Sequence, residues 1–156
     1  MAKIKYNSKF KMQGDFIFKL YDANFVKSYG DTKNNLPISE KKYSNLVVNT
    51  GKDTFADRIA NGNTAGTTGK ITHVAVGTGL SSPAVTDTQL ETEIARAVPD
   101  LPTPTVLDNT VTFDFFFAAP DAIGTLKEVG AFIDATGVVD SGTLFDRAEI
   151  DVEKTP

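Results

Sequence analysis

The sequence predicts an α+β fold, a mostly antiparallel and sandwich-like β-sheet with two short helices and an N-terminal β-hairpin arm. Segments rich in aromatic and β-branched residues alternate between apolar and polar positions, as half-buried strands do. Two shorter segments place apolar residues one helical turn apart behind a capping residue. The 156 residues, 40% hydrophobic and 23% charged, are enough for one ordinary core.

Charge and composition limit the possible functions. The chain has no cysteine and no apolar run of the ~18 residues that span a bilayer, so we predict neither a disulfide nor a membrane partner. Residues 1–52 carry ten lysines and four acids, whereas residues 53–156 carry six basic and sixteen acidic residues. This polarity indicates a charged partner, head-to-tail packing of copies, or two solvated faces of opposite sign. The lysines are scattered, so nucleic acid is not an expected partner.

Two parts are predicted, an N-terminal arm with a β-hairpin at residues 1–44 and a core domain at residues 45–156. Residues 15–30 indicate the hairpin, because aromatic and β-branched residues surround an Asp-Ala-Asn turn. The lysine-rich stretch before it is interpreted as an extended arm. One face of the hairpin's first strand carries Phe16, Phe18 and Leu20, and the other carries Ile17, Lys19 and Tyr21.

The core domain is expected to begin with a short apolar entry and a helix at about residues 51–60. Asn49 or Thr50 would cap this helix, and Asn61-Gly62 would end it. Phe55 and Ile59 lie one turn apart and are predicted to face the core.

We expect the rest of the chain to be arranged around residues 70–96, KITHVAVGTGLSSPAVTDTQLETEIAR. Its first apolar run indicates a buried strand that leads into a tight turn at Gly77-Thr78-Gly79. A Ser/Pro loop follows, and Thr86 or Asp87 would cap the second predicted helix. In that helix Leu90 and Ile94 share one face, and Arg96 stands near the end.

Three C-terminal segments are predicted to form an antiparallel meander, after a hairpin turn at Asp108-Asn109. They are residues 110–118, with Val111, Phe113, Phe115 and Phe117 on one face, residues 126–134, and residues 143–152, with Leu144, Ala148, Ile150 and Val152 facing inward. Gly130 interrupts the second of these strands, where a bulge or the close approach of another backbone is expected.

No catalytic constellation is recognisable, so we predict no enzyme, no cofactor, no metal site and no small-molecule substrate. Gly77-Thr78-Gly79 begins like a dinucleotide fingerprint, but Ser82 holds the third glycine position, which favours a structural turn. His73 has no Cys or second His to complete a zinc site, and is interpreted as a core or interface histidine with a structural hydrogen bond. The acids at 146, 149, 151 and 153 favour a solvated, edge-protecting strand over a calcium site.

One carboxylate is expected to be buried. Glu128 falls in the inward pattern of LKEVGAF, and a buried carboxylate needs a partner that guanidinium supplies in a bidentate fork. Arg96 and Arg147 are the two candidates for this structural link.

The order and spacing of several segments resemble the phage tail-collar fibre N-terminal family and related small tailed-phage virion proteins. The resemblance covers about residues 45–155, from NLVVNTGKDTFADRIANG to GTLFDRAEIDVEKT. It rests on the I-T-H-x-A-x-G-x-G segment, an L-x-x-E-x-x-R-like segment and the E-V-G-x-F strand. The second of these departs from the family, because Glu91 and Glu93 both compete for its acidic position.

The resemblance implies a structural virion protein, made in the host bacterial cytoplasm, that serves as an attachment or adaptor module of a tail fibre, collar, neck or baseplate. It implies other virion proteins as partners, and a homo-oligomer assembled through sheet edges and aromatic contacts. The alternatives are a capsid decoration or head-fibre protein, and a receptor- or glycan-binding module in which tyrosines such as Tyr6, Tyr21, Tyr29 and Tyr43 stack on sugars. The candidate structural and assembly residues are His73, Gly77, Gly79, Arg96, Glu128, Gly130, Arg147, Phe16, Phe18 and Tyr21.

Members of that family continue past the K-T element into a further strand, so we expect an open edge on the last strand here. An open edge recruits a strand. The hairpin at residues 16–29 is expected to fill it, within the chain or in a neighbouring copy, while residues 2–11 add cationic contacts to an acidic neighbour.

Overall fold

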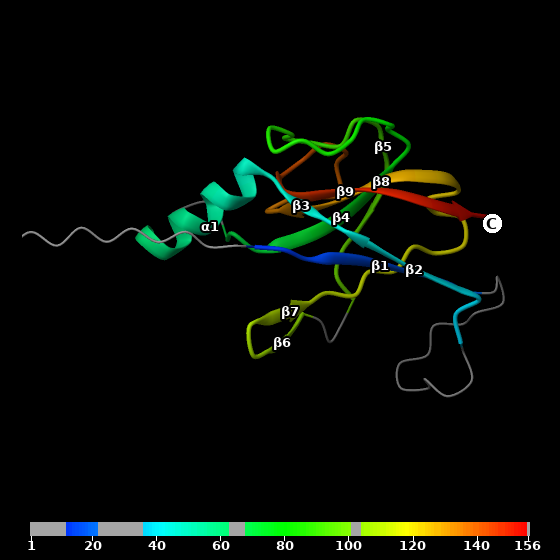
Figure 1. The fold of residues 1–156 in the computed structure, drawn as a ribbon, viewed down its shortest axis with the longest axis horizontal. Coiled ribbons are helices and arrows are strands. Elements are labelled where there is room, and N and C mark those ends of the chain that lie inside the picture. Colours follow the sequence, from blue (N-terminus) through cyan, green and yellow to red (C-terminus); the bar gives the residue numbers. More distant parts are fainter. Residues whose placement is uncertain (1–11, 22–35, 63–67, 101–103, 156) are drawn as a thin grey trace, which may run out of the picture.

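The centre of the molecule is a five-stranded antiparallel sheet in the order β3-β9-β8-β4-β5 (Figure 1). The computed structural model describes residues 12–21, 36–62, 68–100 and 104–155. The elements are β1 (Asp15–Leu20), β2 (Ser39–Ser44), β3 (Leu46–Val47), α1 (Asn49–Asn61), β4 (Ile71–Gly77), β5 (Glu93–Ala97), β6 (Thr105–Leu107), β7 (Thr110–Thr112), β8 (Gly124–Ile133) and β9 (Thr143–Lys154). The broad prediction of a mostly antiparallel α+β fold is confirmed.

Both faces of this sheet are covered, which explains the apolar character of its central strands. One face carries the larger core cluster, made of Val74, Val76, Ala122, Leu126, Val129, Ala148, Ile150 and Val152. The ribbon β1–β2 and the segment with Phe115 and Phe117 pack against it. The opposite face carries Val48, Ala75, Leu90, Phe132, Ala135 and Leu144. The inward positions predicted for β9 are all buried, although Leu144 belongs to the second face.

The N-terminal hairpin differs from the prediction in its second strand. β1 pairs with β2, from Asp15 opposite Ser44 to Leu20 opposite Ser39. The predicted turn at Asp22-Ala23-Asn24 and the rest of the predicted hairpin, up to residue 30, lie outside the described residues. The shared face predicted for Phe16, Phe18 and Leu20 is observed, because all three pack against the larger cluster.

The second predicted helix is wrong. Residues 85–92 form turns and irregular backbone, and β5 follows in antiparallel pairing with β4. Leu90 is buried with 1% of its surface exposed, whereas Ile94, on the strand, is 41% exposed. The i, i+4 spacing of these two residues therefore does not mark one face of a helix. The contacts that this segment makes with β8 and β4 override the local pattern.

The strand predicted at residues 110–118 is also largely wrong. Only Thr110–Thr112 is a strand, paired with β6 around the predicted Asp108-Asn109 turn, where Asp108 has φ 52°. Phe115 and Phe117 pack on the sheet without joining it, except for a single bridge between Phe115 and Pro99. The reason is that β8 already has β9 on one side and β4 on the other, so a third partner has no free edge.

Helix α1 contacts the sheet through its first turn. Gly51 is its buried residue, and a Cβ atom there would lie 2.3 Å from the carbonyl oxygen of Phe145. Val48 is the N-cap and makes no side-chain capping bond, so capping by Asn49 or Thr50 is not observed. Phe55 and Ile59 are 38% and 55% exposed, which corrects their predicted burial.

The end of α1 at Gly62, with φ 69°, agrees with the prediction. In the part of the chain that the structure describes, no helix is long and apolar enough to cross a bilayer.

Candidate functional site

A buried carboxylate on β8 fastens the loop between β4 and β5, residues 78–92, to the sheet. Glu128 is 1% exposed. Its Oε1 accepts the N–H groups of Gly79 at 3.0 Å and Thr92 at 2.7 Å. Its Oε2 accepts the N–H of Glu91 at 2.9 Å and the Nη2 of Arg147 at 2.8 Å. The ionised group therefore has a partner on each oxygen, which is what its burial requires.

Arg147 on β9 extends this network to the outer part of the loop. Its Nη1 lies 2.7 Å from Oδ2 of Asp87, and its Nη2 donates to the carbonyl and hydroxyl oxygens of Ser81, each at 3.1 Å. The predicted link between Glu128 and Arg147 is therefore confirmed. We call Glu128, Arg147 and the loop groups they hold the Glu128–Arg147 clamp.

Two glycines make this clamp sterically possible. A Cβ atom on Gly77 or on Gly79 would lie 2.5 Å from Oε1 of Glu128. Either side chain would therefore displace the carboxylate, so glycine is required for packing, in line with the structural turn favoured for Gly77-Thr78-Gly79.

Further hydrogen bonds join the loop to itself and to α1. The Oε2 of Glu91 accepts the Ser81 N–H at 2.7 Å, and this bond lowers the pKa of Glu91 from its usual value. Asp87 accepts the Ala84 N–H at 2.9 Å. The N–H of Asn49 donates to the Val85 carbonyl at 2.8 Å, which ties the start of α1 to the loop.

Gly130 allows another part of the chain to approach closely, as predicted. A Cβ atom there would lie 2.8 Å from Cδ1 of Leu144 and 2.9 Å from the carbonyl oxygen of Asp146. The irregularities of β8–β9 pairing lie on either side, between Leu126 and Glu128 and between Ala131 and Phe132. Gly130 is therefore a packing position and not itself the bulge.

Arg96 is not the partner of Glu128, which corrects that alternative. It forms a bidentate pair with Glu93, with Nε–Oε1 at 2.5 Å and Nη2–Oε2 at 2.7 Å, and its guanidinium carbon lies 5.1 Å from the ring centroid of Phe132. Its Nη1 donates to the Thr136 carbonyl and the Ser141 hydroxyl, each at 2.8 Å. Arg96 thereby links β5 to the turn between β8 and β9.

His73 is a buried strand residue, and its Nδ1 lies 3.2 Å from Oγ1 of Thr72. Burial, and then the charge of Arg96, lower the pKa of His73 below its usual value, so the imidazole is neutral near neutral pH.

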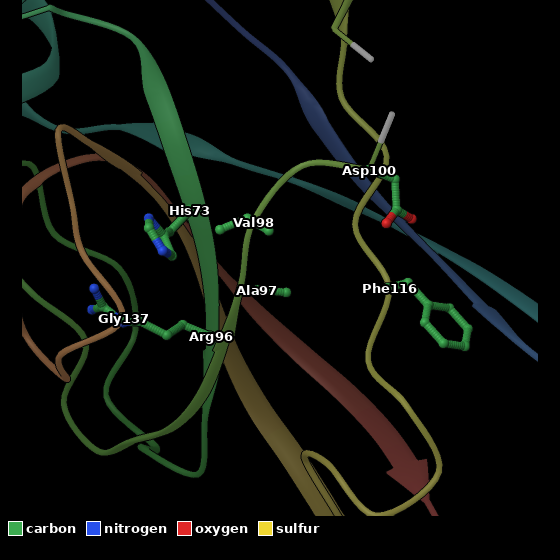
Figure 2. Close-up of a pocket in the computed structure, with 7 residues that line it drawn as sticks. All are labelled: His73, Arg96, Ala97, Val98, Asp100, Phe116 and Gly137. Carbon is green, nitrogen blue, oxygen red and sulfur yellow. The ribbon is translucent and has the colours of Figure 1, made fainter. Parts of the chain in front are cut away.

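A shallow hollow is lined by His73, Arg96, Ala97, Val98, Asp100, Phe116 and Gly137. Figure 2 shows the side chains of Asp100 and Phe116 well away from those of His73 and Arg96, so the polar groups of the hollow do not converge.

Asp146 is buried, although an acidic edge was predicted there. It accepts hydrogen bonds from the Asn45 side chain and, at 3.2 Å, from the Ala131 N–H. The Oδ1 of Asn45 in turn accepts the Gly14 N–H at 2.7 Å, so this chain of bonds fastens the start of β1 to the sheet. Burial raises the pKa of Asp146 to about 7, against the effect of the two donors. The alternating pattern of β9 did not predict that Asp146 is buried, because this burial depends on Asn45, which is far away in sequence.

The N-terminal ribbon does not extend the sheet as a strand beside β9, which corrects, for the described residues, the expectation that it fills this edge within the chain. β1 and β2 form a separate sheet. The Tyr43 hydroxyl accepts the Asp151 N–H at 3.1 Å and donates to its carbonyl at 2.8 Å, while Lys41 donates to the same carbonyl at 2.6 Å. β3 pairs only with Arg147 and Asp146. The ribbon therefore blocks the β9 edge with side chains.

The hairpin β6–β7 is the most exposed element of the described chain. It projects from the body of the molecule in Figure 1, below the ribbon β1–β2. Every residue from 104 to 112 is exposed, and Val106, Leu107 and Val111 are exposed at 70%, 76% and 52%. Apolar side chains gathered on a projecting element are typical of a protein contact surface.

Comparison of the chain with family models, curated proteins and solved structures finds no match. Among the described residues, no group of three or more His, Cys, Asp or Glu side chains is placed to hold a metal ion.

Proposed function

We propose that this chain is a structural protein of a tailed-phage virion, an attachment or adaptor module of a tail fibre, collar, neck or baseplate that is not an enzyme. One observation carries the proposal. The segments on which the resemblance rests, GTG after β4, the L-x-x-E segment and E-V-G on β8, are joined in space by the carboxylate of Glu128. Segments that resemble a family in order and also meet at one buried group are the kind of framework that a family shares.

In this role the clamp sets the shape of the module, and the projecting elements make its contacts. The Glu128–Arg147 clamp holds a long loop rigidly against one face of the sheet, where Leu80 is exposed on its outer side. The hairpin β6–β7 presents apolar side chains elsewhere. Rigid loops and exposed apolar strands are suited to binding other proteins.

The glycan-binding alternative has less support. Tyr43 is one of the tyrosines that this alternative needs as a platform for sugars, but its hydroxyl is bonded to the Asp151 backbone, and its ring meets that of Phe18 edge-on with the centroids 5.9 Å apart. Its ring and its hydroxyl are therefore committed to the protein. A capsid decoration or head-fibre role uses the same surfaces at another place on the particle.

Antibody labelling of intact particles from the source, viewed by electron microscopy, tests the proposal. We expect label at one discrete place, such as the neck or tail tip, while particles treated with non-immune serum stay bare. Label over the whole capsid would support the decoration alternative and contradict the adaptor. An absence of label from every particle would overturn the virion proposal.

Removal of residues 1–40 is not a clean test of assembly. It would delete β1 and the start of β2, and so strip Phe16, Phe18 and Leu20 from the larger core cluster. Removal of residues 1–11 leaves all of the described strands intact.

A further inference from the structure

The hairpin β6–β7 lacks support from the rest of the described chain. A two-stranded hairpin on its own is marginal in water. Its three cross-strand pairs, Thr105–Thr112, Val106–Val111 and Leu107–Thr110, consist entirely of exposed residues. Its exposed apolar side chains and unpaired outer edges would be stabilised by a further strand laid against it.

The sequence on either side of the hairpin is acidic. Residues 97–126 contain four aspartates, at 100, 108, 114 and 121, and no lysine, arginine or histidine. The charge of this stretch is therefore −4, equal to the net charge of the whole chain. A partner strand for this region should be basic on one side and apolar on the other.

The chain contains a segment with this chemistry. Residues 2–11, AKIKYNSKFK, carry four lysines and no acid. The lysines fall at odd positions, 3, 5, 9 and 11, and the apolar or aromatic residues at even positions, Ile4, Tyr6 and Phe10. Such an alternation gives a strand one cationic face and one apolar face. The segment lies outside the described residues, and the structure begins just after it, at Met12.

We propose that residues 2–11 of one copy of this chain dock as a strand against the hairpin β6–β7 of a second copy, which joins the copies head to tail. The apolar positions of the arm would cover Val106 and Val111, while its lysines would face the aspartates around the hairpin. The inference rests on the proposed role as an assembly module, and names the partner as the chain itself.

Charge favours a second copy as the occupant. The basic excess lies in residues 1–52 and the acidic excess in residues 53–156, so each copy presents both halves of a complementary contact. A contact between two different surfaces of identical chains is heterologous, and it builds rings or filaments. Charge pairs of this type also steer and orient the approach of two copies.

Sedimentation equilibrium of the full chain tests the inference. We expect a mass above that of the monomer at low salt, and an apparent Kd that rises at least about tenfold between ~0.05 M and ~0.5 M salt, because ions screen the contact. Changing Lys3, Lys5, Lys9 and Lys11 together to Glu should give a monomer. Changing the same four residues to Arg keeps the charge, and should leave assembly as in the unmodified chain.

A second variant makes the hairpin basic through Thr105→Lys, Thr110→Lys and Asp114→Lys, all at exposed positions. It should also be monomeric alone. A mixture of the two charge-reversed variants should assemble, because each then supplies the complement of the other. Unchanged thermal melting of both variants serves as the folding control.

Three outcomes would overturn the inference. The first is that the Glu variant assembles like the unmodified chain, and the second is that a mixture of the two folded variants stays monomeric. The third is that the unmodified chain is monomeric and its hairpin amides are protected from hydrogen exchange, because such protection indicates docking within one chain. Particle labelling is independent of all three, so failure of this contact is distinguishable from failure of the virion proposal.

Discussion

The two connections that flank β5 are opposites. The loop at residues 78–92 before β5 has no helix or strand, yet its backbone is bonded to Glu128 at three N–H groups and to Arg147 at Ser81. The hairpin β6–β7 after β5 has regular strands and a two-residue turn, yet every one of its residues is exposed. Regular backbone geometry is therefore a poor guide to which connection the fold holds in place. The difference lies in whether a buried group on the sheet reaches the connection.

The largest expected effect comes from breaking the clamp. Glu128→Gln should cost about 3 kcal/mol of unfolding free energy, because it removes the buried carboxylate that pairs with Nη2 of Arg147, leaves Asp87 as the charged partner of that guanidinium, and turns an amide N–H toward donors. Chemical denaturation measures this loss. Hydrogen exchange should show faster exchange in residues 78–92 and no change in the hairpin.

Glu149→Gln is the matched control for this change. Glu149 lies opposite Glu128 in the β8–β9 pairing but is exposed, so we expect a change within about 0.5 kcal/mol. An equal loss in the two variants would show that the clamp is not a special source of stability.

Glycine substitution probes the same loop by steric means. Gly79→Ala should cost about 2 kcal/mol, because the new Cβ would lie 2.5 Å from both Oε1 of Glu128 and Cβ of Glu91. Gly137→Ala is the control, because nothing lies within 4 Å of a Cβ at that position. Thermal melting of the pair measures the difference, and similar melting temperatures would contradict the close packing of the loop.

A second buried carboxylate, that of Asp146, makes the stability of the fold depend on pH. The pKa of Asp146 is raised by burial to about 7 from its ordinary value of 3.8, so between these values the folded chain holds a proton that the unfolded chain has lost. The stability from this group is fully present below about pH 4 and is lost as the pH rises through about 7.

We therefore expect the Asp146 contribution to unfolding free energy to fall by about 1 kcal/mol per pH unit across this window. Asp146→Asn should remove the slope and leave only an offset that does not depend on pH. Denaturation of both proteins at several pH values isolates the effect. Parallel pH profiles for the two proteins would show that Asp146 does not titrate in this range.

The smallest effect on stability is expected in the hairpin. Val111→Thr keeps the shape and the strand preference of the side chain at an exposed site, so the change should stay within about 0.5 kcal/mol. Val129→Thr is the buried counterpart on β8, and it should cost about 2 kcal/mol by placing a hydroxyl in the core. A large loss at Val111 in chemical denaturation would mean that the hairpin contributes to the folded monomer.

Local sequence patterns predicted the features that depend on nearby residues. The alternation of apolar and polar side chains predicted β8 and β9 and the burial of Ile150 and Val152, because alternate residues of a strand face opposite sides. Turn residues located the hairpin turn at Asp108-Asn109 and the end of α1 at Gly62, since they tolerate positive φ. The inward position of Glu128 likewise predicted a buried carboxylate that needs an arginine.

Contacts between remote segments decided the rest. The choice of Arg147 over Arg96, the pairing of β1 with β2 and the burial of Asp146 beneath Asn45 each depend on which segment occupies which place on the sheet. The helix expected around Leu90 did not form, because Glu128 takes up the backbone N–H groups that follow it. By itself, then, the sequence determined the apolar inward positions of β8 and β9 and the turns at Asp108-Asn109 and Gly62. Only the tertiary structure decided which strands and charges meet, because a strand edge or a buried charge accepts whichever partner the completed fold brings within a few ångströms.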